Sequence, residues 1–193
     1  MDTTIRPVRP DDAGAIEAFA ADTWPEHGGD YLPRVLASWV EESERGRTDD
    51  GRPARTLVAD VDGRAVGLLR VVILSSTEAW CGGLRVDPEY RGEGLARRLC
   101  ETAFDWARER GAAVARAMVF SWNAAGLGVA RAVGFQSATE FRWAHPEPAV
   151  ASGATTGGPP DPNAVWDHWR ESTARDHLEG LALDPAEPWA LST

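Results

Sequence analysis

The residues best suited to chemistry lie between Arg91 and Ala96, where the chain reads Arg-Gly-Glu-Gly-Leu-Ala. An apolar, strand-like stretch ends just before them at Pro88, and the apolar residues that follow recur at helical spacing. Gly92 and Gly94 allow positive φ angles and a close approach of a ligand, and the first N–H groups of a helix have no partner within it. A strand, a glycine turn and a helix start together predict a cradle for a pyrophosphate group.

The sequence excludes two better-known phosphate-binding motifs. A P-loop closes with Gly-Lys-Ser or Gly-Lys-Thr, whereas Gly94 is followed by Leu95 and the chain contains no lysine. A dinucleotide fingerprint would place its third glycine at position 97, which is Arg97 here. The turn therefore belongs to neither of these nucleotide sites.

The turn resembles the acetyl-CoA-binding motif of the GNAT superfamily of N-acetyltransferases, Arg/Gln-x-x-Gly-x-Gly/Ala, whose named positions are Arg91, Gly94 and Ala96. Further matches to the family precede and follow the motif in the family's order: Leu84, Val86 and Pro88 before it, and Asn123 and Gly134-Phe135 after it. The resemblance covers residues 4 to 144.

The elements around the turn are predicted from apolar spacing and from breakers. Before the turn we expect a strand at Ile5–Arg9, a helix from Asp11 or Asp12 to about Ala21, a helix at residues 32–45, and strands at 56–60, 65–74 and 78–86. After it we expect a helix from Gly94 to Arg110, a parallel strand at 113–120, a short helix capped by Asn123, and a strand at 135–143. This order predicts an α/β fold, and the resemblance implies a mixed sheet with splayed parallel central strands, flanked by helices.

The composition changes after residue 145. We expect an acetyl-CoA-binding domain at residues 1–145, a flexible linker at 146–163 and a C-terminal helical arm at 164–193. A helix of that size cannot form a core by itself. The arm must therefore dock on the domain, pair with a second copy in a homodimer, or open a further region of a longer protein. The last residues carry no terminating signal, so we expect either a truncated chain or a swapped arm.

The resemblance implies that acetyl-CoA is the co-substrate and lies in the gap between the splayed strands. Main-chain groups of Leu84 and Val86 would bond the pantetheine amides in the manner of an added strand. The amides from Gly92 to Ala96 would hold the diphosphate, with charge from Arg91 and Arg97. The residues expected to bind the cofactor are Leu84, Val86, Arg91, Gly92, Glu93, Gly94, Leu95, Ala96 and Asn123.

The reaction implied is a direct attack of a primary amine, on a small molecule or a protein, on the thioester. An alkyl amine with a pKa of about 10.4 must lose a proton first. Glu78 is the candidate base, because an even separation from Val86 puts both side chains on one face of a strand. The alternative for Glu78 is a solvated strand-end carboxylate. Weaker candidates for the base are Asp22, Glu26 and His27.

The resemblance further implies that the loop before residue 32 lines the acceptor pocket. Trp24, His27 and Tyr31 are therefore candidates for substrate contact, or alternatively loop anchors. The family commonly places a tyrosine on the short helix as general acid, and that place is Ala130 here. A thiol with a pKa of about 8.5 can leave with modest help, but the missing acid supports an alternative function, a non-catalytic acyl-CoA-binding regulatory or interaction domain.

Charge, cysteine content and the N-terminal sequence indicate which ligands and which cellular location to expect. The chain has 30 acidic residues against 20 basic ones, all arginine, and a net charge of -10, which repels nucleic acid and favours amines. The alternative explanation of an acidic chain without lysine is adaptation to high salt or a GC-rich genome. Cys81 and Cys100 have the spacing of neither a disulfide framework nor a zinc site, so we expect no metal. The N-terminus lacks the apolar core of a signal peptide, and Arg70 interrupts the longest apolar run. We therefore expect a cytoplasmic protein without a membrane segment.

Overall fold

The computed structural model describes residues 3–21, 23–140, 161–178, 181–184, 187 and 190–192. The chain divides into two compact units. The first contains Met1–Phe135 together with Leu183–Ser192, and the second contains Gln136–Ala182 and Thr193. The C-terminal stretch from Leu183 to Ser192 thus belongs to the same unit as the glycine turn.

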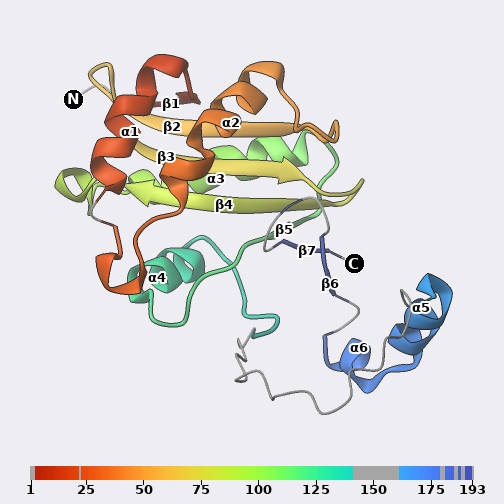
Figure 1. Ribbon diagram of the computed structural model, residues 1–193. Helices are drawn as coiled ribbons and strands as arrows, with labels where there is room; N and C mark the ends of the chain where they lie inside the picture. Colours follow the sequence, from red (N-terminus) through yellow and green to blue (C-terminus); the bar gives the residue numbers. More distant parts are fainter. Residues whose placement is uncertain are drawn as a thin grey trace, which may run out of the picture. The chain divides into compact units, whose positions relative to one another are not determined.

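A five-stranded sheet in the order β1-β2-β3-β4-β5 forms the centre of the first unit (Figure 1). The first four strands pair antiparallel, and β4 pairs parallel with β5. The prediction of a mixed sheet with a parallel pair is confirmed, but the pair lies at the edge of the sheet and not at its centre. The strands are β1 (Thr3–Pro7), β2 (Ala54–Val61), β3 (Arg64–Ile73), β4 (Glu78–Val86) and β5 (Val114–Arg116).

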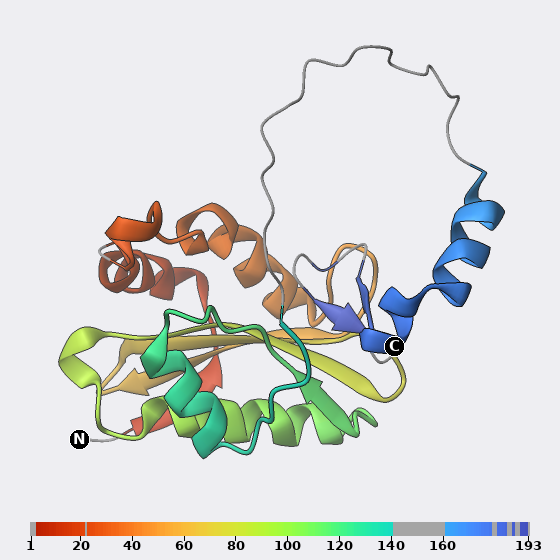
Figure 2. The ribbon, with the colours of Figure 1, turned by 90° about the horizontal axis from the view of Figure 1, so that it is seen from below.

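Helices cover both faces of this sheet, as Figure 2 shows. α1 (Ala13–Ala20) and α2 (Leu32–Arg45) pack on one face, where Leu68 of β3 lies in their core. α3 (Leu95–Arg108) packs on the other face, and its buried residues include the four that helical spacing predicts: Leu95, Leu99, Ala103 and Trp106. α4 (Ala124–Ala132) follows β5, and short 3-10 turns lie at Pro10–Asp12 (η1), Pro25–His27 (η2) and Pro88–Tyr90 (η3).

The sheet ends earlier than the sequence suggests. The strand expected at residues 113–120 is only Val114–Arg116, because β5 pairs with β4 over Glu78–Trp80 alone. Beyond Arg116 the chain leaves the sheet toward α4 (Figure 1), so no backbone partner remains to extend the strand. The strand expected from residue 135 is also absent as far as Glu140, and its last three residues lie outside the described ones.

The C-terminal part differs from the helical arm expected at residues 164–193. It contains α5 (Pro162–Glu171) and α6 (Thr173–His177), interrupted at Ser172, whose backbone is extended. β6 (Ala182–Leu183) and β7 (Leu191–Ser192) form a separate two-stranded sheet. The expected linker lies outside the described residues up to residue 160, and Pro162 already begins α5. No helix within the described residues is long and apolar enough to cross a membrane.

Candidate functional site

A β-bulge in β4 decides which way the site-forming residues point. Arg70 of β3 pairs with Gly82, and Leu68 pairs with Arg85, so Leu69 alone faces the two residues Gly83 and Leu84. Gly83 has a φ of 71°, which favours glycine. The extra residue shifts the alternation of side chains by one for the rest of the strand.

The bulge corrects the argument that places Glu78 and Val86 on one face of the strand. Ala79 and Cys81 lie in the core under α3, and beyond the bulge Leu84 and Val86 pack against that same core. Glu78, next to Ala79, therefore points to the opposite face from Val86. The Glu78 side chain is 4% exposed, and its carboxylate accepts hydrogen bonds from Arg116 at 2.7 and 3.2 Å. It is thus not the solvated carboxylate of the alternative interpretation.

The second half of β4 forms an open edge on the side of β5. The β4–β5 pairing stops at Trp80, whereas β4 continues to Val86. Along this edge the Val86 carbonyl accepts from Arg91 Nε at 3.2 Å, and the Leu84 carbonyl accepts from Arg85 at 2.9 Å. The carbonyl groups of Leu84 and Val86, the two residues expected to bind pantetheine, thus lie along an edge where an extended ligand could be added as a strand.

The glycine turn joins this edge to α3. Asp87 Oδ1 accepts from the Glu89 N–H at 3.0 Å and fixes the start of the turn. Gly92 and Gly94 have φ angles of 86° and 74°, and a Cβ on either would meet no atom within 4 Å. The exposed backbone from Gly92 therefore has open space in front of it and leads into the helix that begins at Leu95. These are the properties of an anion site at a helix N-terminus.

Other residues expected to touch the cofactor make contacts of their own. Arg97 is exposed, and its guanidinium bonds Glu101 at 2.7 Å. Asn123 caps α4, because its Oδ1 accepts from the Gly126 N–H at 2.9 Å. The capping role predicted for Asn123 is confirmed, and its side-chain oxygen is used in the helix cap. Glu93 is exposed in the turn, and Ala96 lies half-buried in the first turn of α3.

The loop before α2 is joined to the loop before α4 by aromatic contacts. Trp24 makes edge-to-face contacts with Phe120 and Trp122, at centroid distances of 6.0 and 5.1 Å. His27 stacks on Trp122 at 3.8 Å. Trp24 has a φ of 54°, a left-handed conformation that is strained for a residue with a side chain. The structure thus brings Trp24 and His27 together with Phe120 and Trp122, which the sequence analysis did not consider. The position of Trp122 next to Asn123 in the sequence could have indicated that it lies near the site.

Arg85 connects this loop to the bulge. Its guanidinium forms two hydrogen bonds with the Asp30 carboxylate, at 2.7 and 2.9 Å, and the Asp30 side chain is 1% exposed. The same guanidinium lies over the rings of Trp24 and Tyr31, at 4.1 and 5.5 Å. Burial raises the pKa of Tyr31, although Arg85 opposes the change. Glu26 is exposed near His27, and Asp22 lies outside the described residues.

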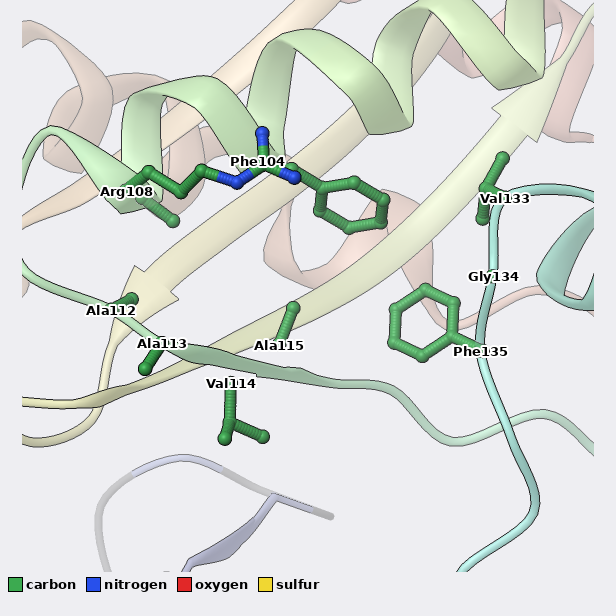
Figure 3. A pocket seen from close by; sticks show the side chains of 10 residues that line it. Phe104, Arg108, Ala112, Ala113, Val114, Ala115, Val133, Gly134 and Phe135 are labelled. Atoms are coloured by element: carbon green, nitrogen blue, oxygen red, sulfur yellow. The ribbon is translucent and has the colours of Figure 1, made fainter.

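A cavity lies elsewhere, between α3, β5 and residues 133–135 (Figure 3). Its lining is mainly apolar and includes Phe104 and Phe135, whose rings meet edge to face at 5.6 Å. Neither the turn nor the second half of β4 lines it, so the cavity is distinct from the open edge of β4.

Within the described residues, no three His, Cys, Asp or Glu side chains are grouped to hold a metal ion.

Comparisons with known proteins bear on this arrangement of strand edge, turn and helix. The model of the acetyltransferase (GNAT) family matches residues 15–135, which contain the sheet from β2 to β5 and the glycine turn. A comparison with curated protein sequences finds no match.

Several solved structures have a similar fold. A transcriptional regulator from Bacillus halodurans C-125 matches with a TM-score of 0.59 and 23% identity, over 75% of this chain and 99% of the other. A PaiA N-acetyltransferase from Thermoplasma acidophilum, in complex with coenzyme A, matches with a TM-score of 0.59 and 20% identity, over 72% and 94%. The ribosomal-protein-S18-alanine N-acetyltransferase from Escherichia coli matches with a TM-score of 0.56 and 22% identity, over 72% and 80%.

Proposed function

Since the chain belongs to the acetyltransferase (GNAT) family, we propose that it is an acetyl-CoA-dependent N-acetyltransferase that modifies a primary amine. The observation that carries the proposal is the open edge of β4 leading directly into a glycine turn and the N-terminus of α3. A strand edge suits the amides of a pantetheine arm, and the helix start suits a diphosphate. Acetyl-CoA contains both groups in this order.

The residues of the turn would divide the work of holding the diphosphate. The N–H groups from Gly92 to Ala96 are the proposed donors, and the exposed backbone with open space at both glycines supports this. Arg91 adds a positive charge next to them, although its Nε also holds the Val86 carbonyl. Arg97 contributes less, because Glu101 is already bound to it.

In the proposed reaction the amine nitrogen attacks the thioester carbonyl carbon, and the carbon–sulfur bond then breaks to release CoA as a thiolate. A main-chain N–H near Val86 would stabilise the negative oxygen of the tetrahedral intermediate. Because Ala130 stands where the family commonly has a tyrosine, the thiolate would take its proton from water. A thiol pKa of about 8.5 makes that departure feasible near neutral pH.

Glu78 is our proposed acceptor of the amine proton, acting through a chain of waters, because it begins the strand that Val86 ends, roughly 25 Å away along the extended chain. The bulge supports this in a way that the sequence argument did not. Glu78 shares its face of β4 with Arg85, whose guanidinium bonds Asp30 of the acceptor loop. Replacing Glu78 with Gln should lower turnover mainly at low pH, where few amine groups are already neutral. Arg116→Gln keeps the carboxylate but removes its cation, so it should move the low-pH fall in turnover to higher pH, and an unaltered pH profile in Glu78→Gln would reassign the base.

The acceptor would lie against the loop that carries Trp24, His27 and Tyr31. The strained Trp24 backbone and the contacts across to Trp122 support a wall of the amine site at this place. The amine could belong to a small molecule or to a protein.

The test is the release of free CoA from acetyl-CoA in the presence of polyamines, aminoglycosides, peptides and aryl-alkyl amines, with detection of the N-acetyl product by mass spectrometry. Amine-dependent release supports the enzyme. Tight binding of acetyl-CoA without release across the panel would instead favour a binding module, the second function that the missing tyrosine suggests.

A further inference from the structure

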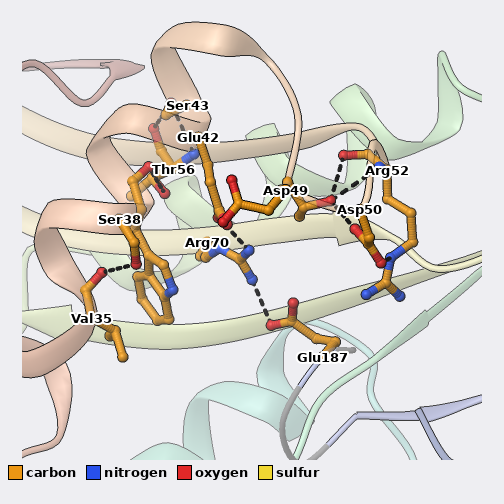
Figure 4. A network of polar contacts seen from close by, with 12 residues as sticks. Val35, Ser38, Glu42, Ser43, Asp49, Asp50, Arg52, Thr56, Arg70 and Glu187 are labelled. Carbon is orange, nitrogen blue, oxygen red and sulfur yellow. Dashed lines mark hydrogen bonds and ion pairs between the residues drawn. The ribbon is translucent and has the colours of Figure 1, made fainter. Parts of the chain in front are cut away.

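The C-terminal segment, defined as Leu183–Ser192, lies beyond the family match yet supplies a buried carboxylate to the first unit. Glu187 is 7% exposed, and its Oε1 accepts from Arg70 Nη1 at 2.5 Å (Figure 4). A second ion pair holds the same segment, between Asp184 and Arg52 at 3.0 Å. The Glu187 pair holds Arg70 of β3, the strand next to β4, whereas the Asp184 pair holds Arg52 in the loop before β2.

Arg70 is the first step of a connection from Glu187 to the open edge of β4. It lies in β3, is 4% exposed, and stands opposite Gly82, the residue just before the bulge. Its other nitrogen, Nη2, bonds Glu42 of α2 at 2.6 Å. The guanidinium lies 5.1 Å from the ring centroid of Trp39. Glu187 and Glu42 therefore fix the position of a buried cation against the Trp39 ring.

Trp39 is the second step, because its ring rests directly on the bulge. A Cβ placed on Gly83 would lie 2.5 Å from Cζ3 and 2.7 Å from Cη2 of Trp39. Gly83 therefore cannot shift toward α2 without moving the ring. The bulge in turn determines that Leu84 and Val86 face α3 and present their main chain along the open edge. A displacement of Trp39 would thus loosen the part of β4 that is proposed to bind the pantetheine arm.

From these contacts we infer that Glu187 is a positioning residue of the acetyl-CoA site, acting through Arg70 and Trp39 on the bulge at Gly83. The inference rests on the proposed function, since it assigns a role at the proposed site. It makes the C-terminal segment part of the cofactor-binding apparatus, although the segment begins 48 residues after the family match ends at residue 135.

The simpler explanation is that Glu187 only anchors the segment, and Arg52 provides the comparison that separates the two. Arg52→Gln removes the ion pairs of Arg52 with Asp184 and Asp50, and it leaves in place the hydrogen bond from the Glu187 N–H to Asp184 Oδ1 at 2.8 Å. If anchoring were the whole role, Glu187→Gln and Arg52→Gln would have similar effects. If Glu187 acts on the bulge, only its own replacement will affect β4.

Amide hydrogen exchange of the ligand-free full-length protein tests this directly. We expect Glu187→Gln to accelerate exchange about tenfold in peptides covering residues 80–86, and Arg52→Gln to leave those peptides at the wild-type rate. Titration calorimetry with acetyl-CoA should show a Kd about tenfold higher for Glu187→Gln and unchanged for Arg52→Gln. Equal exchange in both variants, or wild-type exchange and Kd in Glu187→Gln, would overturn the inference.

Circular dichroism and the melting temperature establish that each variant is folded. If Glu187→Gln does not fold, Glu187→Asp keeps the charge with a shorter side chain, and it should show a smaller acceleration at residues 80–86. Wild-type exchange in Glu187→Asp would then count against the inference. The exchange result does not need a ligand, so a wild-type protein that fails to bind acetyl-CoA would refute the proposed function and leave the positioning result to be judged separately.

Discussion

Replacing Gly94 with Glu should strongly weaken acetyl-CoA binding while leaving the protein folded. Gly94 is the N-cap of α3 and has a φ of 74°, so any side chain there strains the backbone. That strain costs about 1–2 kcal/mol of folding free energy. No atom lies within 4 Å of a Cβ at this position, so no clash adds to the cost.

The effect on binding comes from charge. A carboxylate about 6 Å from a phosphate charge repels it by roughly 1–3 kcal/mol at the effective dielectric constants of protein surfaces. Such a loss corresponds to a rise in Kd of about five- to 150-fold. Gly94→Gln has nearly the same shape and the same backbone strain but no charge, and it is the matched control.

Titration calorimetry with acetyl-CoA, at low and at high salt, measures both variants. We expect Gly94→Glu to bind far more weakly than Gly94→Gln, with part of the difference removed by salt because screening weakens the repulsion. The placement of the diphosphate at this turn is refuted if the two variants bind acetyl-CoA with equal affinity.

Three further predictions concern parts of the structure around the site. Asn123→Ala should lose about 1 kcal/mol of stability through the α4 cap, whereas Asn123→Asp should keep it, as thermal unfolding would show. Burial alone would raise the pKa of Asp12, but its hydrogen bonds from Arg6 and from the Arg9 N–H outweigh this and lower it. Asp12→Asn should therefore destabilise the protein at pH 7, and the difference should shrink as the pH falls below about 4, where unfolded aspartate becomes protonated. Burial raises the pKa of Cys81 to about 12 and that of Cys100 to about 11, so a thiol reagent at pH 8 should label neither cysteine until the protein is unfolded.

Local signals in the sequence predicted the helices on either side of the candidate site well. The helical spacing after the turn gave α3, and Asn123 followed by Gly134 gave the cap and the end of α4. These features depend on residues within about three helical turns of each other, so nearby residues in the sequence determine them.

The β-bulge in β4 was not predicted from the sequence, and this omission led to the wrong face for Glu78. Gly82-Gly83 inside a predicted strand is a recognised sign of a bulge, and it would have corrected the face assigned to Glu78. The pairs Arg70–Glu187 and Arg85–Asp30 could not be predicted, because their partners are separated by 117 and 55 residues and only the folded sheet brings them together.

The most direct test of the central claim is amide hydrogen exchange of the wild-type protein with and without acetyl-CoA. We predict protection of the main-chain amides at residues 82–97, the edge of β4 and the turn, and no protection around the cavity between α3 and β5. Binding that leaves residues 82–97 unprotected would contradict the account.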